Sequence, residues 1–268
     1  MPEICRAEYL AGKNGAADMP SCAVMVSSCD AYRDLWRPFF TLFWRYWPDC
    51  PFPVYLGANE ARYQDPRVTT LKVPEHTWSK NLKGFLEQIE ADYVLMLLDD
   101  FFLNGPIDTN LLVRHLLALD SFDGTVLRIY PRPGPEQRLA EHKEIGLLHP
   151  RAPYRVSAQP AFWHRAKLIG LLRDNESAWE FESKGTERSQ AHANGFYGTY
   201  QPLLSYRHVV ERGEWFWSAA RRYKTEQIGC DFDARPVMGP LKAVKKAVNR
   251  FRKHRWNAIS PIDWRIRD

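Results

Sequence analysis

The first half of the chain alternates short apolar runs with longer segments in which apolar residues recur every three or four positions. The short runs predict buried strands over residues 22–28, 51–59, 68–74, 92–100 and 124–131. The longer segments predict amphipathic helices over residues 30–49, 77–91 and 109–121. This alternation favours an α/β fold, in which a mostly parallel sheet is flanked by helices.

Beyond about residue 131 the pattern is less regular. It predicts a strand within residues 154–163, a helix over 165–174 and a second helix beginning near residue 177. Residues 198–216 mix strand signals with aromatic residues and predict no single element. We therefore expect a mixed second half joined to a regular first half.

An acidic doublet follows the most apolar of the predicted strands. Residues 94–98 read VLMLL, and Asp99 and Asp100 come directly after them. In open α/β sheets, ligands bind at the carboxyl ends of the strands, where this doublet is expected to lie. Two carboxylates repel each other, and a Mg²⁺ or Mn²⁺ ion that also binds a substrate diphosphate would remove that repulsion. The alternative is structural: one aspartate caps a turn and the other is solvated.

The composition indicates a folded globular chain. Its 268 residues are 45% hydrophobic, and no apolar run approaches the roughly 20 residues that a membrane-spanning helix needs. Residues 1–20 show no signal-peptide pattern and the five cysteines form no Cys-x-x-Cys pair, so we expect reduced thiols and a cytoplasmic location. The sequence contains neither a dinucleotide-binding nor a phosphate-binding glycine motif, and no zinc-ligand spacing.

Positive charge is concentrated near the end of the sequence. Residues 241–256 hold seven cationic side chains and no acid, and without them the formal net charge falls from +5 to −2. On a helix, Leu241, Val244 and Val248 would share one side, which is typical of a cationic amphipathic helix at a membrane surface. A terminal helix packed on the body is the alternative. The near-neutral body argues against nucleic-acid binding.

The order of the elements and several short motifs resemble the nucleotide-sugar half of GT-A glycosyltransferases. The motifs are SSCD at 27–30, WRPFF at 36–40, PVYLGAN at 53–59, TWSKNL at 77–82 and DYVLMLLDDFFL at 92–103. The chain is similar to bacterial enzymes that build surface polysaccharides such as O-antigen, capsule and lipopolysaccharide. That family usually carries Asp-x-Asp, whereas the residue two positions before Asp100 is Leu98 in this chain.

The resemblance implies a Rossmann-type donor-binding half and assigns residues to it. The residues that would bind the nucleoside, the base or the donor phosphates are Ser27, Ser28, Asp30, Asn59, Ser79, Lys80 and Asp99. Asp100 would bind the divalent metal, with Asp99 as a second ligand and His208 as a further candidate. Ordinary loop chemistry explains the serines and the asparagine equally well, and Lys80 is also explained as a solvated helix residue.

The second half would supply the acceptor site and the catalytic base. Glu180 and Glu182 lie close to aromatic residues, and a partly desolvated carboxylate would have the raised pKa that suits a base near neutral pH. On a helix only one of the two can face the cleft, because residues two apart point in different directions. Gln159, Trp163 and Trp179 are candidates for binding acceptor sugars. The alternative places the aromatic residues in the core and both glutamates at the surface.

Together with the acidic doublet, the resemblance implies a metal-dependent glycosyltransferase of hexosyltransferase type, with a nucleotide-sugar donor, expected to be UDP-linked, and a saccharide or lipid-linked saccharide acceptor. The expected parts are an N-terminal extension (1–20), a nucleotide-sugar-binding half (21–131), an acceptor-binding half of the same domain (132–235) and a basic tail (236–268). The tail would hold the enzyme peripherally at the inner face of the cytoplasmic membrane. The alternatives are a nucleotidyltransferase, which should carry a glycine-rich loop after its first strand, and a non-catalytic membrane-associated scaffold.

Overall fold

The computed structural model describes residues 19–239, which belong to two compact units divided after Arg207. Nearly all of the expected N-terminal extension and the whole basic segment 241–256 lie outside the described residues. The prediction of a membrane-surface helix in that segment therefore stays a prediction. Within residues 19–239, no helix is both long and apolar enough to cross a bilayer.

A nine-stranded sheet forms the centre of the larger unit. In sequence order its strands are β1 (Cys22–Ser27), β2 (Val54–Ala58), β3 (Val68–Lys72), β4 (Tyr93–Leu98), β6 (Val126–Arg128), β7 (Gln137–Arg138), β8 (Ile145–Leu147), β9 (Ala161–His164) and β10 (Phe196–Thr199). Their spatial order is β3-β2-β1-β4-β9-β6-β10-β8-β7. Strands β3, β2, β1 and β4 run parallel, whereas β9 is antiparallel to both β4 and β6. The predicted α/β class, with a mostly parallel sheet and a mixed second half, is confirmed.

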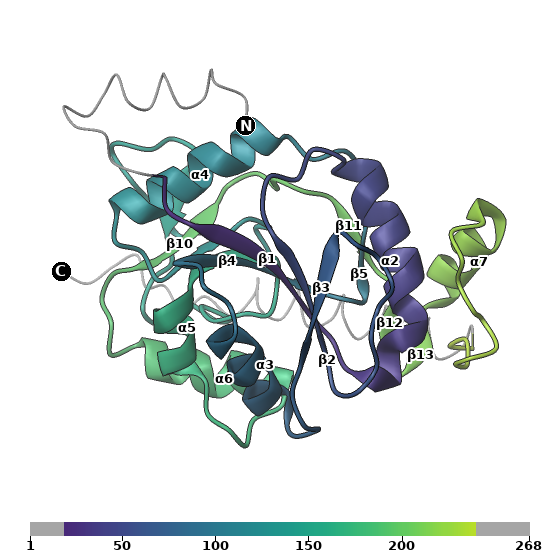
Figure 1. The fold of residues 1–268 in the computed structure, drawn as a ribbon. Helices are drawn as coiled ribbons and strands as arrows, with labels where there is room; N and C mark the ends of the chain where they lie inside the picture. The colour runs from purple at the N-terminus through teal and green to yellow at the C-terminus, as the bar shows by residue number, and fades with distance from the viewer. Residues whose placement is uncertain (1–18, 240–268) are drawn as a thin grey trace. The chain divides into compact units, whose positions relative to one another are not determined.

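Helices flank this sheet (Figure 1). They are the 3-10 turn η1 (Asp30–Tyr32) and the helices α2 (Arg33–Tyr46), α3 (Trp78–Glu87), α4 (Thr109–Ser121), α5 (Arg165–Leu171) and α6 (Ala178–Ser189). Helices α3, α5 and α6 pack against one another and share a core cluster with Met25, Val94 and Met96 of the sheet. Because side chains alternate along a strand, the intervening residues of β1 and β4 face the opposite side of the sheet.

Local sequence explains where two of the helices begin. The Asp108 side chain accepts a hydrogen bond from the backbone N–H of Leu111 at 2.9 Å, as expected for the N-cap of α4. Helix α6 begins with a capping box, in which the side chains of Ser177 and Glu180 each accept a backbone N–H of the other residue. These caps satisfy amides that would otherwise lack partners at the helix starts.

The core is built from the apolar runs that the sequence pattern singles out. Val94, Leu95 and Met96 of β4 are completely buried, which fits a strand covered on both faces. Gly57 of β2 lies so close to the ring of Phe85 that an added Cβ would overlap it. A glycine at this position therefore lets α3 approach the sheet.

The predicted strand within 154–163 forms only at its end, as β9. Its earlier residues turn toward α6 instead of pairing with the sheet: the N–H of Val156 donates to Thr186 Oγ1 at 3.1 Å, and the N–H of Ala158 donates to Glu182 Oε1 at 2.9 Å. Side-chain acceptors on a helix thus replace the strand partners of these amides. A single-sequence pattern carries no information about such distant partners.

A short strand and the smaller unit complete the described chain. Strand β5 (Phe101–Leu103) follows β4 and pairs with β11 (Tyr206–His208), whose first two residues belong to the larger unit. The smaller unit contains the hairpin β12 (Val210–Glu211) and β13 (Glu214–Trp215), followed by α7 (Trp217–Glu226). Its buried centre is Trp215, whose ring lies 5.1 Å from that of Phe232.

Candidate functional site

The carboxyl ends of β1 and β4 meet at one edge of the sheet. Ser27 pairs in register with Leu98, so the residues that follow each of them are also neighbours. The Ser28 hydroxyl donates a hydrogen bond to Asp99 Oδ2 and accepts one from Trp36 Nε1 at 2.7 Å. This serine therefore links the acidic doublet to helix α2.

A second polar pair lies where β1 and β2 end. Asp30 accepts hydrogen bonds from the backbone N–H groups of Asn59, Glu60 and Ala61 at 2.9–3.0 Å. Its own N–H donates to the Asn59 side chain at 3.3 Å. Burial acts to raise the pKa of Asp30, but the three backbone donors outweigh it and hold the pKa below its ordinary value. Ionised Asp30 thus holds the loop after β1 against the loop after β2, where Asn59 is its hydrogen-bond partner.

The two aspartates of the doublet have different surroundings. Asp99 is only 6% exposed and lies on the β1 side, where burial and then its charge raise the pKa of the Cys29 thiol. Asp100 lies on the side of Tyr206, whose pKa is raised by burial, by Tyr130 and by the charge of Asp100. The doublet therefore presents one carboxylate toward the loop that follows β1 and one toward the second half of the chain.

Tyr206 joins the doublet to the predicted acceptor side. Its ring stacks on Phe101 at 4.5 Å and lies 4.6 Å from Tyr130, and its hydroxyl donates to Gln159 Oε1. With Oε1 engaged, Gln159 presents its Nε2 group as a hydrogen-bond donor. The sequence pattern singles out Gln159 but neither Tyr206 nor Tyr130, because nothing in the local pattern of the two tyrosines distinguishes them from packing residues.

The two glutamates of α6 have separate roles. Glu180 belongs to the capping box and also pairs with Lys184 at 2.9 Å. The backbone N–H of Ser177, followed by the contact with Lys184, lowers the pKa of Glu180 to about 2. The predicted raised pKa is therefore wrong for Glu180, since donors and a cation stabilise its charged form.

Glu182 lies on the other side of the helix, against the loop that precedes β9. Its Oε1 accepts hydrogen bonds from the Ser157 hydroxyl at 2.8 Å and from the backbone of Ala158 at 2.9 Å. The Ser157 hydroxyl in turn accepts a bond from the N–H of Gln159 at 3.2 Å. A continuous polar chain thus runs from Glu182 through Ser157 and Gln159 to Tyr206, beside Asp100.

The remaining predicted residues are dispersed. Trp163 is completely buried in the core, which matches the packing alternative, whereas Trp179 is 59% exposed in the first turn of α6. Ser79 is completely buried: its hydroxyl donates to the carbonyl of Arg173 and accepts from the N–H of Glu176 at 3.0 Å. This arrangement ties the start of α3 to the loop before α6. Lys80 follows on the exposed face.

A divalent ion at the doublet would need further ligands from water or from a substrate. Within residues 19–239, no group of three or more His, Cys, Asp or Glu side chains is arranged to hold a metal ion. Two neighbouring carboxylates nevertheless suit Mg²⁺ or Mn²⁺, which keep waters and take other ligands from substrate phosphates. Asp99 and Asp100 would then be the protein ligands. His208 belongs to the smaller unit, and its role as a metal ligand stays a prediction.

The fold and the edge just described define an α/β protein with a polar edge at the carboxyl ends of β1, β2 and β4, which is where ligands bind in open α/β sheets. No known family model matches the chain, and no curated protein matches its sequence. Solved structures with a similar fold include the 1–349 fragment of S. aureus TarS, with 16% identity and a TM-score of 0.46 over 69% of this chain and 59% of the fragment.

Two further solved structures show a similar chain path. TarS 1–349 in complex with UDP has 15% identity and a TM-score of 0.48, over 71% of this chain and 61% of that one. A CMP-2-keto-3-deoxy-manno-octonic acid synthetase complexed with CTP has 11% identity and a TM-score of 0.38, over 67% and 88%. The chain thus spans about three fifths of the TarS fragment. Because all three TM-scores lie below 0.5, the function is argued from the residues of this chain.

Proposed function

We propose that the chain is a GT-A-type glycosyltransferase that takes its sugar from a nucleoside-diphosphate sugar, with UDP as the expected nucleotide. The observation that carries the proposal is the junction of β1 and β4, where Ser28 bonds to Asp99 and Asp100 lies next in the chain. The Asp30–Asn59 pair lies at the end of the adjoining strand β2. Polar loops at three neighbouring carboxyl ends suit a nucleotide bound across the edge of the sheet.

Each part of this edge has a role in the proposal. Ser27, Ser28, Asp30 and Asn59 would bind the nucleoside, and Ser28 also fixes the position of Asp99. Asp99 and Asp100 would hold a Mg²⁺ or Mn²⁺ ion, which neutralises charge on the departing diphosphate when bound. Ser79 is buried, so of Ser79 and Lys80 only the exposed lysine would contact the donor phosphates.

The acceptor side is assigned to the polar chain that ends at Tyr206. Gln159 would donate from Nε2 to an acceptor oxygen, and the exposed ring of Trp179 would stack on a sugar. Glu182 is the favoured base, because the cap and Lys184 lower the pKa of Glu180 to about 2, which makes Glu180 a weak base near neutral pH. Since Oε1 of Glu182 is engaged by Ser157 and Ala158, its Oε2 would take the proton of the acceptor hydroxyl. The proposed acceptor is a saccharide or a lipid-linked saccharide.

The main rival is a nucleotidyltransferase with the same kind of sheet. Such an enzyme is expected to wrap the triphosphate with a glycine-rich basic loop after its first strand. Here residues 28–32 contain no glycine and pass directly into η1 and α2. This difference favours the glycosyltransferase.

Thermal denaturation with nucleotides tests the proposal. The full chain would be heated alone, with UDP, with UDP- and GDP-sugars, and with CTP, each with and without MnCl₂. A ligand at about 100 times its dissociation constant stabilises a protein by about 2.7 kcal/mol, which raises the Tm by roughly 5–10 °C for a chain of this size. We expect such a shift with UDP or a UDP-sugar, and only in the presence of the metal.

Paired variants make the test specific to the doublet. Asp100→Asn should abolish the shift with UDP. Asp108→Asn makes the same chemical change at the cap of α4, where asparagine serves as well as aspartate, and should keep the shift. The absence of a shift with every nucleotide would overturn the proposed function. An undiminished shift in Asp100→Asn would refute the metal assignment, and a shift with CTP alone would favour the rival.

A further inference from the structure

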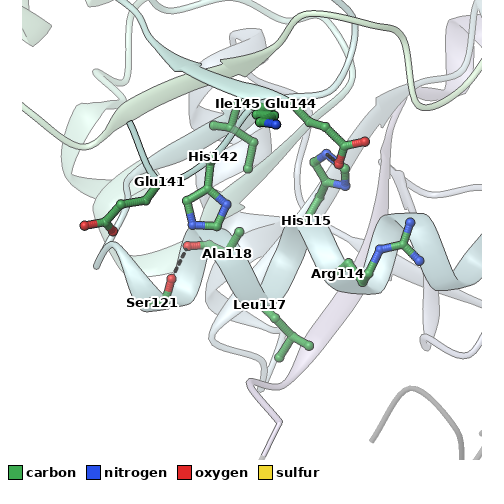
Figure 2. A pocket seen from close by; sticks show the side chains of 10 residues that line it. Arg114, His115, Leu117, Ala118, Ser121, Glu141, His142, Glu144 and Ile145 are labelled. Carbon is green, nitrogen blue, oxygen red and sulfur yellow. Dashed lines mark hydrogen bonds and ion pairs between the residues drawn. The ribbon is translucent and has the colours of Figure 1, made fainter. Parts of the chain in front are cut away.

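A pocket lies apart from the polar edge of the sheet, between the C-terminal half of α4 and residues 141–145. Figure 2 shows its lining side chains, which include two histidines and two glutamates. Its volume is about 610 Å³, within the range of roughly 300–1,000 Å³ that is usual for small-molecule sites. None of the residues assigned to donor or acceptor binding lines it. The proposed function therefore leaves this pocket without a role.

The centre of the pocket is the pair formed by His115 and Glu144. His115 is only 3% exposed, and its Nδ1–H donates to the carbonyl of Leu111 at 2.8 Å, which leaves Nε2 as the acceptor nitrogen of the neutral ring. Burial lowers the pKa of His115, so the neutral ring is favoured near pH 7. Figure 2 shows this ring beside the Glu144 carboxylate, with Nε2 and Oε2 3.7 Å apart.

Two acceptors that face each other at this distance cannot bond to one another. Each can accept a hydrogen bond from a donor placed beside them, such as a hydroxyl group. A metal ion is the other species that binds two lone pairs. However, the described residues offer no group of three or more ligating side chains, so a protein-held metal is not favoured here. The pair therefore selects for a ligand that carries hydrogen-bond donors.

Charge around the pocket is balanced. Arg114 and Lys143 contribute two positive charges, and Glu141 and Glu144 contribute two negative charges. This balance gives no net attraction for a simple anion or a simple cation. The cations can donate hydrogen bonds and the carboxylates can accept them, so a neutral molecule with many hydroxyl groups satisfies both.

Apolar side chains line another part of the pocket, and backbone hydrogen bonds hold one of its walls against the sheet. Leu117, Ala118 and Ile145 supply an apolar surface, of the kind that packs against the C–H faces of a sugar ring. The carbonyl of Glu144 accepts the N–H of Tyr200 at 3.0 Å, and Ile145 pairs with Thr199 of β10. One wall is thus part of helix α4, and Ile145 begins strand β8, whereas residues 141–144 belong to no helix or strand.

We propose that this pocket binds a neutral saccharide, whose hydroxyl groups donate to His115 Nε2 and Glu144 and accept hydrogen bonds from Arg114 and Lys143. The site is separate from the proposed catalytic edge and does not depend on the proposed function. It would let the protein hold a glycan independently of any nucleotide.

The test uses the ¹⁵N-labelled full chain and four neutral disaccharides: maltose, cellobiose, lactose and N,N′-diacetylchitobiose. Each is titrated into the millimolar range while backbone amide shifts are recorded, with EDTA present and again with ZnCl₂. We expect at least one sugar to cause saturable shifts at residues 114–118 and 141–145, in EDTA. No nucleotide is added, so the result is independent of the catalytic proposal.

Glu144→Gln is the diagnostic variant. Its new amide N–H can donate to His115 Nε2 in place of the sugar, so the affinity should fall about tenfold or more, as when a hydrogen bond to a charged group is lost. Glu87→Gln, at an exposed position on α3, removes the same charge and should bind like the parent. The proposal is overturned if no sugar produces shifts, if binding requires zinc, if the shifts centre on residues 99–104, or if Glu144→Gln binds normally.

Discussion

The bond network of Ser28 offers a quantitative test of how the acidic doublet is held. Ser28→Ala removes the hydroxyl that donates to Asp99 and accepts from Trp36. Trp36 is 4% exposed and Asp99 is 6% exposed, so water cannot readily replace the lost partner. A buried donor without an acceptor costs about 1–3 kcal/mol, and a hydrogen bond to a charged group is worth roughly 1.5–3 kcal/mol.

Taking the lower part of each range gives a loss of about 3 kcal/mol for Ser28→Ala. For a chain of this size, this corresponds to a decrease in Tm of about 6–12 °C. Urea denaturation followed by circular dichroism measures the change in the free energy of unfolding. Ser205→Ala, at an exposed serine, should stay within about 0.5 kcal/mol of the parent.

A double-mutant cycle separates the Ser28–Trp36 bond from other losses. Trp36→Phe removes the indole N–H, together with ring volume that is lost equally in both backgrounds. In the Ser28→Ala background that N–H already lacks its acceptor, so Trp36→Phe should be less destabilising there, by roughly 1–2 kcal/mol. If the two changes in free energy instead add within about 0.5 kcal/mol, the hydrogen bond from Trp36 to Ser28 does not form in solution.

Three further outcomes are expected. Glu182→Gln should keep the Tm within about 2 °C of the parent, because its amide oxygen still accepts the hydrogen bonds from Ser157 and Ala158. Glu182→Ala loses that acceptor and should lower the Tm by roughly 4–8 °C. Equal Tm values for the two variants in calorimetry would contradict this contact between α6 and the loop before β9. Glu180 has a folded pKa of about 2, below its ordinary value of 4.5, so its stabilising effect is present above about pH 4.5 and is lost as the pH falls toward 2. Glu180→Gln should therefore flatten that part of the stability–pH curve, and an unchanged curve in urea titrations would exclude the capping role. Gly57→Ala should destabilise by about 1–3 kcal/mol through overlap with Phe85, and Phe85→Leu in the same chain should recover part of the loss; denaturation that shows no recovery would place the strain elsewhere.

Sequence reasoning performed best where the physical cause is local. The continuous apolar run of β4 and the apolar periodicity of α2 and α4 each depend on residues that are close together in the sequence. For the same reason the helices and longer strands of residues 22–131 were predicted in the correct order, whereas the short strand β5 was not predicted. The antiparallel insertion of β9 between β4 and β6 was not predicted, because strand order is decided by packing between distant segments.

In the candidate site, too, some contacts follow from local sequence and others depend on tertiary packing. Ser28 and Asp99 could be placed together from sequence, since both follow parallel strands that the pattern predicts to be buried. Tyr206 could not, because it reaches the doublet only through the pairing of β11 with β5. The two glutamates of α6 look alike in the sequence, yet one is fixed in a cap and the other is bound to a distant loop.

By itself, the sequence determined the α/β class, the buried strand β4 and the acidic residues that follow it, since apolar periodicity acts over a few residues. Only the tertiary structure decided which polar groups meet: Ser28 with Asp99, Gln159 with Tyr206, and His115 with Glu144. Hydrogen bonds and burial act over a few ångströms in space, and the sequence order does not reveal which distant residues come that close.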